Sequence, residues 1–429
     1  MRTLALASLL LVTRLSPAEN GQFPLRIGPT SRYLVDQAGN PFLLHGDSPW
    51  SLIVAVTKED ADLYFADRRA KGVNTIIVNL IEHKFNGPVN RYGEGPFRTP
   101  GDFATPNEAY FAHADWVLRR AAENGMVVLL TPMYLGYRGL DEGWYQEALL
   151  NGSFKCHEYG KWVGERYKSY KNIIWVIGGD RRADQAREAV DALARGLHES
   201  NPDALFTAHA EPGVSAMEEY AIAGLDINST YTYDIVHKKV LQDYSRRPVM
   251  PFFLFETSYE GEHEASEVQI RRQAYWALLS GAMGQCYGNR PLWLFDPGWK
   301  DALNSPGARD MARVRKLFNA LPWYEFEPDT AHRVVTSGLG EENGMDRLTA
   351  ARTRDRSLMA AYMPARREIE VDLGQLQRGR FSGWWYDPRS GMSIPVAEKL
   401  DSGRVRLIPP SEGDWALVIQ SGEKSGRVP

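Results

Sequence analysis

Two uninterrupted apolar runs, each leading to an acid, are the strongest pattern along the chain. The residues from Phe252 to Phe255 are all apolar and are followed by Glu256. The residues from Ile173 to Ile177 are also apolar and are followed by two glycines and Asp180. An apolar run without alternation predicts a strand that is covered on both faces, as in a parallel sheet. A charged group at the end of such a strand is costly unless it is paired or used, so both acids are candidates for chemistry.

Similar runs alternate with helical patterns along most of the chain. One helix is expected to begin after Thr57, with Asp60 at its third position, and to stop at Gly72. Asn107 is expected to cap a second helix, which Gly125 ends. Four further helices are expected at about 157–170, 183–200, 265–280 and 308–320, and the eight strands at 41–47, 74–81, 126–132, 172–180, 205–210, 226–233, 251–256 and 284–289.

Eight strands that alternate with helices predict an α/β fold, a (β/α)8 TIM barrel. An open, doubly wound sheet is the structural alternative. No glycine-rich phosphate loop follows the first strand, which weakens that alternative.

The pattern changes after Pro328. Short β-like runs such as EIEVDL and DWALVIQ are separated by turn residues, which predicts a C-terminal antiparallel β-sandwich. We expect a signal peptide at 1–18, a barrel at 19–325, the sandwich at 326–421 and a disordered tail at 422–429. The short link from Leu321 to Pro328 indicates that the sandwich is docked on the barrel.

The N-terminus resembles a secretory signal. Arg2 precedes an apolar run from Leu4 to Val12, and a small-residue site follows at Ser16-Pro17-Ala18. We therefore expect a secreted or periplasmic protein. The run is too short to span a bilayer and no other segment is long enough, so no membrane span is expected.

Composition narrows the classes of partner. The chain has 429 residues and a net charge of −4 with no basic block, which argues against nucleic acid as the main partner. Aromatic residues make up 11%, a supply that suits a carbohydrate site but that large cores also consume. Cys156 and Cys286 lie far apart in sequence, and we expect two unpaired thiols.

Polar and aromatic residues gather where the predicted strands end, the edge at which barrel enzymes place their active sites. Asp180 and Glu256 are the candidate catalytic pair, since glycoside hydrolysis needs one acid to protonate the leaving oxygen and one carboxylate to attack or to activate water. The substrate would be an oligo- or polysaccharide, and the sequence leaves protein partners open. The candidate substrate-binding residues are His45, Asp47, Trp50, Asn79, His209, Tyr231, Tyr233, Tyr259 and Trp293.

Each candidate has a structural alternative. Asp180 could cap the helix that follows it, and Glu256 could belong to an ion pair, with Glu260 and Glu262 as nearby acids. The histidines and tryptophans could be core residues. Neither a metal nor an organic cofactor is expected, because no HExxH or comparable cluster and no phosphate loop is present.

The motifs HGDSPW, WVIGGD and FLFETSYEGEH, taken together, resemble the apiosidase-like glycoside hydrolases. The segments GWWYDPRSG and DWALVIQ resemble the collagen-binding β-domain that follows such barrels. The resemblance implies a (β/α)8 barrel, a retaining mechanism and cleavage at apiose in plant pectic side chains. It also implies that Asp180 is the acid/base and Glu256 the nucleophile.

Two other functions stay open at this point. The same two carboxylates could serve an arabinofuranosidase or another β-glycosidase, and the sequence does not separate these from an apiosidase. The barrel could also bind carbohydrate without catalysis, although a binding module has no need for both acids.

Overall fold

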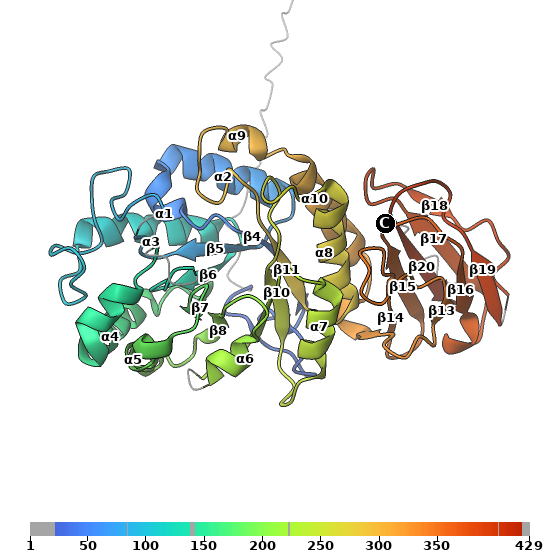
Figure 1. Cartoon of the computed structure of the whole chain (residues 1–429), viewed down its shortest axis with the longest axis horizontal. Helices are drawn as coiled ribbons and strands as arrows, with labels where there is room; N and C mark the ends of the chain where they lie inside the picture. The colour runs from blue at the N-terminus through green and yellow to red at the C-terminus, as the bar shows by residue number, and fades with distance from the viewer. Residues whose placement is uncertain (1–21, 84, 138–141, 222–223, 402, 423–429) are drawn as a thin grey trace, which may run out of the picture.

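The structure is a computed structural model that describes residues 22–83, 85–137, 142–221, 224–401 and 403–422. The predicted leader at 1–18 and residues 423–429 of the predicted tail lie outside these ranges. Figure 1 shows a barrel surrounded by helices and, beside it, a second body built from the C-terminal strands.

Eight parallel strands form one sheet in the order β8-β7-β6-β5-β4-β11-β10-β9, so each strand lies beside its neighbours in sequence. This arrangement is a nearly closed barrel and confirms the predicted (β/α)8 fold. The strands are β4 (Leu44–Asp47), β5 (Thr75–Asn79), β6 (Val127–Thr131), β7 (Ile173–Gly178), β8 (Leu205–His209), β9 (Asn228–Tyr231), β10 (Phe252–Glu256) and β11 (Gly284–Tyr287).

The seam of the barrel lies between β8 and β9. The backbone N–H groups of Asp226 and Ile227 both donate to the carbonyl of Phe206, at 2.9 and 3.0 Å. The Ser229 hydroxyl donates to the carbonyl of Ala208 at 2.5 Å. These bonds hold the two end strands together, so the carboxyl ends of all eight strands surround one site.

Helices cover the outside of the barrel and connect its strands. Thr57 and Asn107 cap two of them as predicted, by accepting from the N–H groups of Asp60 and Ala109. The helices are α1 (Leu52–Ala55), α2 (Lys58–Ala70), α3 (Glu108–Glu123), α4 (Tyr145–Tyr167), α5 (Arg187–Ser200), α6 (Ala216–Glu219), α7 (Val236–Ser245), α8 (Glu267–Leu279), α9 (Trp299–Ala302) and α10 (Pro306–Asn319).

Several elements differ from the prediction, among them the short helices α1, α6 and α9, which were not expected. The helix expected at 157–170 begins at Tyr145 and is interrupted at Gly152, where φ is 65°. The helix α7 was not predicted; it starts after Ile235, which cannot cap through its side chain, so the usual start signal is absent. The first predicted strand divides into β4 and β3 (Pro41–Phe42), which belongs to another sheet.

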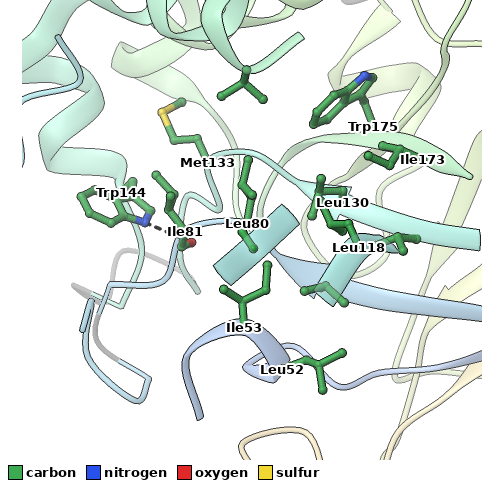
Figure 2. Packing of buried hydrophobic residues seen from close by; sticks show 14 of the residues in the cluster. Leu52, Ile53, Leu80, Ile81, Leu118, Leu130, Met133, Trp144, Ile173 and Trp175 are labelled. Carbon is green, nitrogen blue, oxygen red and sulfur yellow. Dashed lines mark hydrogen bonds between the residues drawn. The ribbon is translucent and has the colours of Figure 1, made fainter. Parts of the chain in front are cut away.

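Side chains alternate between the barrel interior and the helix layer. Ile77, Leu129 and Val176 belong to the interior cluster, while their strand neighbours pack outward against helices. Figure 2 shows part of this outer packing, in which Leu130 lies near Leu118 of α3.

A small antiparallel sheet closes the amino end of the barrel. It consists of β1 (Arg26–Ile27), β2 (Leu34–Val35) and β3. Leu34 and Phe42 from this sheet pack into the same cluster as the barrel interior. The carboxyl end of the barrel is therefore the end that a substrate can approach.

The C-terminal residues form two antiparallel sheets, which confirms the predicted sandwich. Six strands follow the order β12-β14-β15-β20-β17-β18, and three follow the order β13-β16-β19. Met359, Trp385 and Ile419 pack against Val371 in the core between the sheets. The strands are β12 (Phe326–Pro328), β13 (Val335–Ser337), β14 (Thr349–Thr353), β15 (Leu358–Met363), β16 (Ile369–Asp372), β17 (Phe381–Tyr386), β18 (Ser393–Pro395), β19 (Arg404–Leu407) and β20 (Trp415–Ser421).

The sandwich lies against α8 and α10 of the barrel (Figure 1). A buried ion-pair network joins the two parts. Arg271 of α8 donates to both carboxylate oxygens of Asp414 at 2.8 and 2.9 Å, and to Asp310 of α10 at 2.8 Å. The Tyr362 hydroxyl donates to Asp414 at 2.9 Å, and its ring stacks on Tyr275 at 4.3 Å. The two cysteines, which are both buried, form no disulfide, as predicted.

We expect Asp414→Asn to lower the free energy of unfolding by about 3 kcal/mol. Breaking a buried pair costs roughly 3–5 kcal/mol, and the lower end applies because Asp310 still faces Arg271. Urea unfolding of the full chain measures the change. Glu412→Gln is the matched control, since Glu412 is 88% exposed and pairs with Arg366 only at 3.5 Å. Equal stability of both variants and the wild type would show that the network does not hold the sandwich in place.

Candidate active site

A β-bulge turns Glu256 to the inside of the barrel. The ring of Phe255 already belongs to the interior cluster, so in a regular strand the next side chain would face the helices. The pairing with β9 is irregular here: Leu254 lies opposite Thr230, and Glu256 lies opposite the next residue, Tyr231. Two residues of β10 thus share one place in the ladder, and Glu256 faces the interior.

Two glycines place Asp180 at the same end of the barrel. Gly178 has a φ of 91°, a conformation that favours glycine, and a Cβ there would lie 2.4 Å from the Tyr220 ring. A Cβ on Gly179 would lie 2.4 Å from the backbone nitrogen of Leu135. The chain therefore passes through a space that only glycine fits before it reaches Asp180, which is 7% exposed.

Three side chains surround the Glu256 carboxylate. His209 Nε2, at the end of β8, lies 3.0 Å from Glu256 Oε2. The Tyr233 hydroxyl donates to Glu256 Oε1 at 3.4 Å and accepts from the Tyr231 hydroxyl at 3.0 Å. Tyr259, three residues after the end of β10, also forms a hydrogen bond with the carboxylate. The structure thus brings together four of the predicted substrate-binding residues around one predicted catalytic acid.

Burial shifts the pKa values of both Glu256 and His209. It raises the pKa of Glu256 to about 8, with the Glu262 charge adding to the rise and hydrogen bonds from Tyr233 and Tyr259 opposing it. Burial also lowers the pKa of His209 to about 4, against the charge of Asp180. The imidazole beside Glu256 is therefore neutral near pH 7.

The charges of Asp180 and Glu256 both influence the pKa values of the same two tyrosines. Burial raises the pKa of Tyr134 and of Tyr231, and the charges of both acids raise each pKa further. In the barrel order, β7 and β10 are separated by β8 and β9. The two carboxyl groups thus approach one region from different sides of the barrel, as a pair that flanks a sugar would.

Two polar side chains at this end have hydrogen-bonding capacity to spare. Asn79 continues the inward-facing series of β5 and is 1% exposed, yet both its amide atoms lack a hydrogen-bond partner within the described ranges. Neither nitrogen of His209 has an aligned partner there. Such groups suit sugar hydroxyls, which both donate and accept.

The two predicted tryptophans take different positions. Trp50 is 4% exposed, and its indole N–H donates to the Tyr259 hydroxyl at 2.9 Å, so it supports the site from below. Trp293 is half-buried, donates to Glu262 Oε1 at 2.7 Å and meets Phe85 edge to face. Trp293 is therefore the ring that a substrate can reach.

His45 and Asp47 do not reach the site, which corrects the prediction. Both side chains point from β4 into the helix layer. Asp47 is fully buried and accepts from Tyr64 at 2.8 Å and from Arg68 at 2.5 Å. His45 lies 3.4 Å from Gln285, and burial lowers its pKa to about 3. The strand has the expected residues, but the alternation of β4 turns these two outward.

Two specific structural alternatives, Asp180 as a helix N-cap and Glu256 in an ion pair with a lysine or arginine, are not observed among the described residues. Asp180 is not the N-cap residue of the helical turns that follow it, because Ala183 and Ala186 occupy those positions. Glu256 has no lysine or arginine partner among the described residues. Glu260 has a structural role. Its carboxylate accepts hydrogen bonds from Tyr287, Asn289, Ser305 and the backbone N–H of Gly307.

Phe85 and Tyr134 complete the aromatic lining and were outside the predicted set. Their rings lie 5.4 Å apart, and Tyr134 stacks on His209 with ring centroids 6.2 Å apart. Tyr134 follows β6 at a strand end, which was a usable signal. Phe85 lies in a loop, where no strand or helix periodicity indicates the direction of a side chain. Within the described ranges, no three side chains of metal-binding type converge.

Two family descriptions match the chain. Residues 29–325 match "Apiosidase-like, catalytic domain", and residues 331–420 match "Putative collagen-binding domain of a collagenase". No curated protein matches the chain significantly in sequence.

Solved structures share the fold. One described as a glycoside hydrolase is 24% identical over 95% of this chain and 100% of its own, with a TM-score of 0.82. A glycoside hydrolase family 5 protein from Bacteroides vulgatus is 23% identical over 95% and 97% of the two chains, with a TM-score of 0.83. A GH30 endoxylanase from Clostridium papyrosolvens is 10% identical over 89% of this chain and 97% of its own, with a TM-score of 0.52.

We expect Glu262→Gln to move the rising limb of the kcat/KM pH profile to lower pH. Removing the Glu262 charge stabilises the Glu256 anion, so the pKa of Glu256 falls and the reactive anion forms at lower pH. Glu264→Gln, an exposed acid two residues away, should leave the profile unchanged. A shift confined to the falling limb would instead give Glu256 the role of the acid.

Proposed function

This chain belongs to the apiosidase-like family of glycosidases, and we propose that it is a retaining enzyme with Glu256 as nucleophile and Asp180 as acid/base. The observation that carries the proposal is the inward-facing Glu256, held beside a neutral imidazole and two phenols at the carboxyl end of the barrel. Asp180 comes to the same end from another strand and acts on the same tyrosines.

In the first step, Glu256 would attack the anomeric carbon while the bond to the leaving oxygen breaks. Asp180 would give its proton to that oxygen. The result is a glycosyl group bonded to Glu256. In the second step, a water would attack the same carbon, Asp180 would take the proton of the water, and the bond to Glu256 would break.

Burial would make Glu256 more basic, and hydrogen bonding would orient its anion. A carboxylate with a raised pKa is a stronger base than an exposed one, which favours nucleophilic attack once it is ionised. The hydroxyls of Tyr233 and Tyr259 donate to the anion and orient it. The neutral His209 and the amide of Asn79 would bind hydroxyls of the sugar.

We propose apiose-containing plant pectic glycans as the substrate. Support comes from the family to which residues 29–325 belong. Within that proposal, Trp293 would contact an apolar face of the glycan, since its ring is half-buried and lies beside Phe85.

Export is a further part of the proposal, supported by the leader pattern at 1–18. N-terminal sequencing of the protein from its native host should find the first eighteen or so residues removed. A retained Met1 in cytoplasmic protein would contradict export.

A screen of pectic oligosaccharides and aryl glycosides, with the released sugar identified, tests the substrate. The first-formed product should keep the anomeric configuration of the substrate, as observed by NMR before mutarotation. Glu256→Gln should lower kcat on the order of 10⁴-fold or more with the fold intact. Release of arabinose or another sugar would replace the substrate proposal, and inversion would eliminate the nucleophile role of Glu256.

A further inference from the structure

A cavity of about 180 Å³ lies where α7 of the barrel meets the sandwich. One side is formed by α7 and the end of α8, and the other by residues around β12 and β14. A single water needs only roughly 10–15 Å³ of such volume, so this space suits a small molecule. It is separate from the Asp180–Glu256 site, none of whose residues line it.

The cavity contains a buried arginine without a carboxylate partner. Arg347 is 9% exposed, and its guanidinium donates to the carbonyl of Gly340 at 3.0 Å and lies 2.9 Å from His332 Nε2. No carboxylate of the described chain pairs with it. Two acids also line the cavity, but Asp329 accepts from three backbone N–H groups and Glu342 is exposed. A buried guanidinium in this state favours an anionic ligand.

A second polar group in the cavity is unused. His237 is 4% exposed, and its Nε2 has no hydrogen-bond partner within the described ranges. Burial, together with the charges of Arg347 and Lys238, lowers the pKa of His237 to about 4. The ring is therefore neutral near pH 7 and offers one hydrogen bond to a hydroxyl group.

The remaining lining combines Lys238 and three hydroxyl side chains with an apolar side made mainly of leucines. Leu241, Leu279, Leu339 and Leu348 face the same space. A ligand that fits must therefore combine one negative charge, hydroxyl groups and an apolar face. A sugar ring that carries a carboxylate has all three.

We propose that this cavity is a binding site for an acidic sugar residue, a hexuronate. Its carboxylate would pair with Arg347, a ring hydroxyl would bond His237, and the C–H face of the ring would lie on the leucines. Because barrel and sandwich both contribute residues, a bound uronate would bridge the two domains and add a contact with acidic glycans outside the active site.

Isothermal titration of the full chain with galacturonate tests the site. The monosaccharide has no glycosidic bond, so the result does not depend on hydrolase activity. We expect saturable binding that Arg347→Gln weakens about tenfold or more, with no binding of neutral galactose. His237→Gln, which keeps the size of the side chain, should weaken binding less and serves if Arg347→Gln does not fold.

Two controls locate the binding. Glu256→Gln should bind galacturonate like the wild type, as should Arg404→Gln, since Arg404 lies outside the cavity lining and forms an exposed pair with Glu370. Absence of binding to the wild type would overturn the proposal, as would loss in Glu256→Gln with retention in Arg347→Gln. Equal affinity for acetate would also overturn it, because the sugar would then contribute nothing.

Discussion

The burial of one carboxylate, Glu256, is the constraint on which the rest of the site depends. An isolated carboxylate at the end of a buried strand would be protonated, and burial indeed raises the pKa of Glu256 to about 8. Hydrogen bonds from neighbouring phenols oppose this rise only in part. The bulge in β10 turns the side chain inward, and Tyr233 and Tyr259 donate to it. The glycosidase chemistry thus rests on a carboxyl group that the barrel makes basic and the adjacent hydroxyls stabilise as an anion.

Helix α8 connects this site with the sandwich. On one face, Gln273 accepts from the Thr257 hydroxyl at 3.3 Å and donates to the Ser258 carbonyl at 3.1 Å, directly after Glu256. On another, Arg271 holds Asp414 of the sandwich. The same helix therefore fixes the segment that follows the catalytic strand and carries the main contact between the domains. We infer that the sandwich braces the active site as well as the barrel.

The sequence predicted most of what depends on local pattern. The apolar runs that end at Glu256 and before Asp180 became strands of the barrel, and Thr57 and Asn107 capped helices as expected. The prediction was less successful for the direction in which individual side chains point from a strand. His45 and Asp47 are at the predicted strand end but face outward, while Glu256 faces inward only because of a bulge. A one-residue irregularity in pairing reverses the side chain's face, and pairing is a property of two strands that one segment cannot reveal. The long-range partners of Glu256, such as Tyr233, were likewise visible as candidates but not as contacts.

The most direct test of the central claim is azide rescue of two alanine variants, Glu256→Ala and Asp180→Ala, on an aryl glycoside that the enzyme cleaves. Azide can take the place of the missing nucleophile and attack the anomeric carbon of the substrate directly. We predict that Glu256→Ala releases a glycosyl azide of inverted configuration, and that Asp180→Ala releases one of retained configuration through the intact Glu256. An inverted azide from Asp180→Ala, with a retained one from Glu256→Ala, would show that the two acids have exchanged roles.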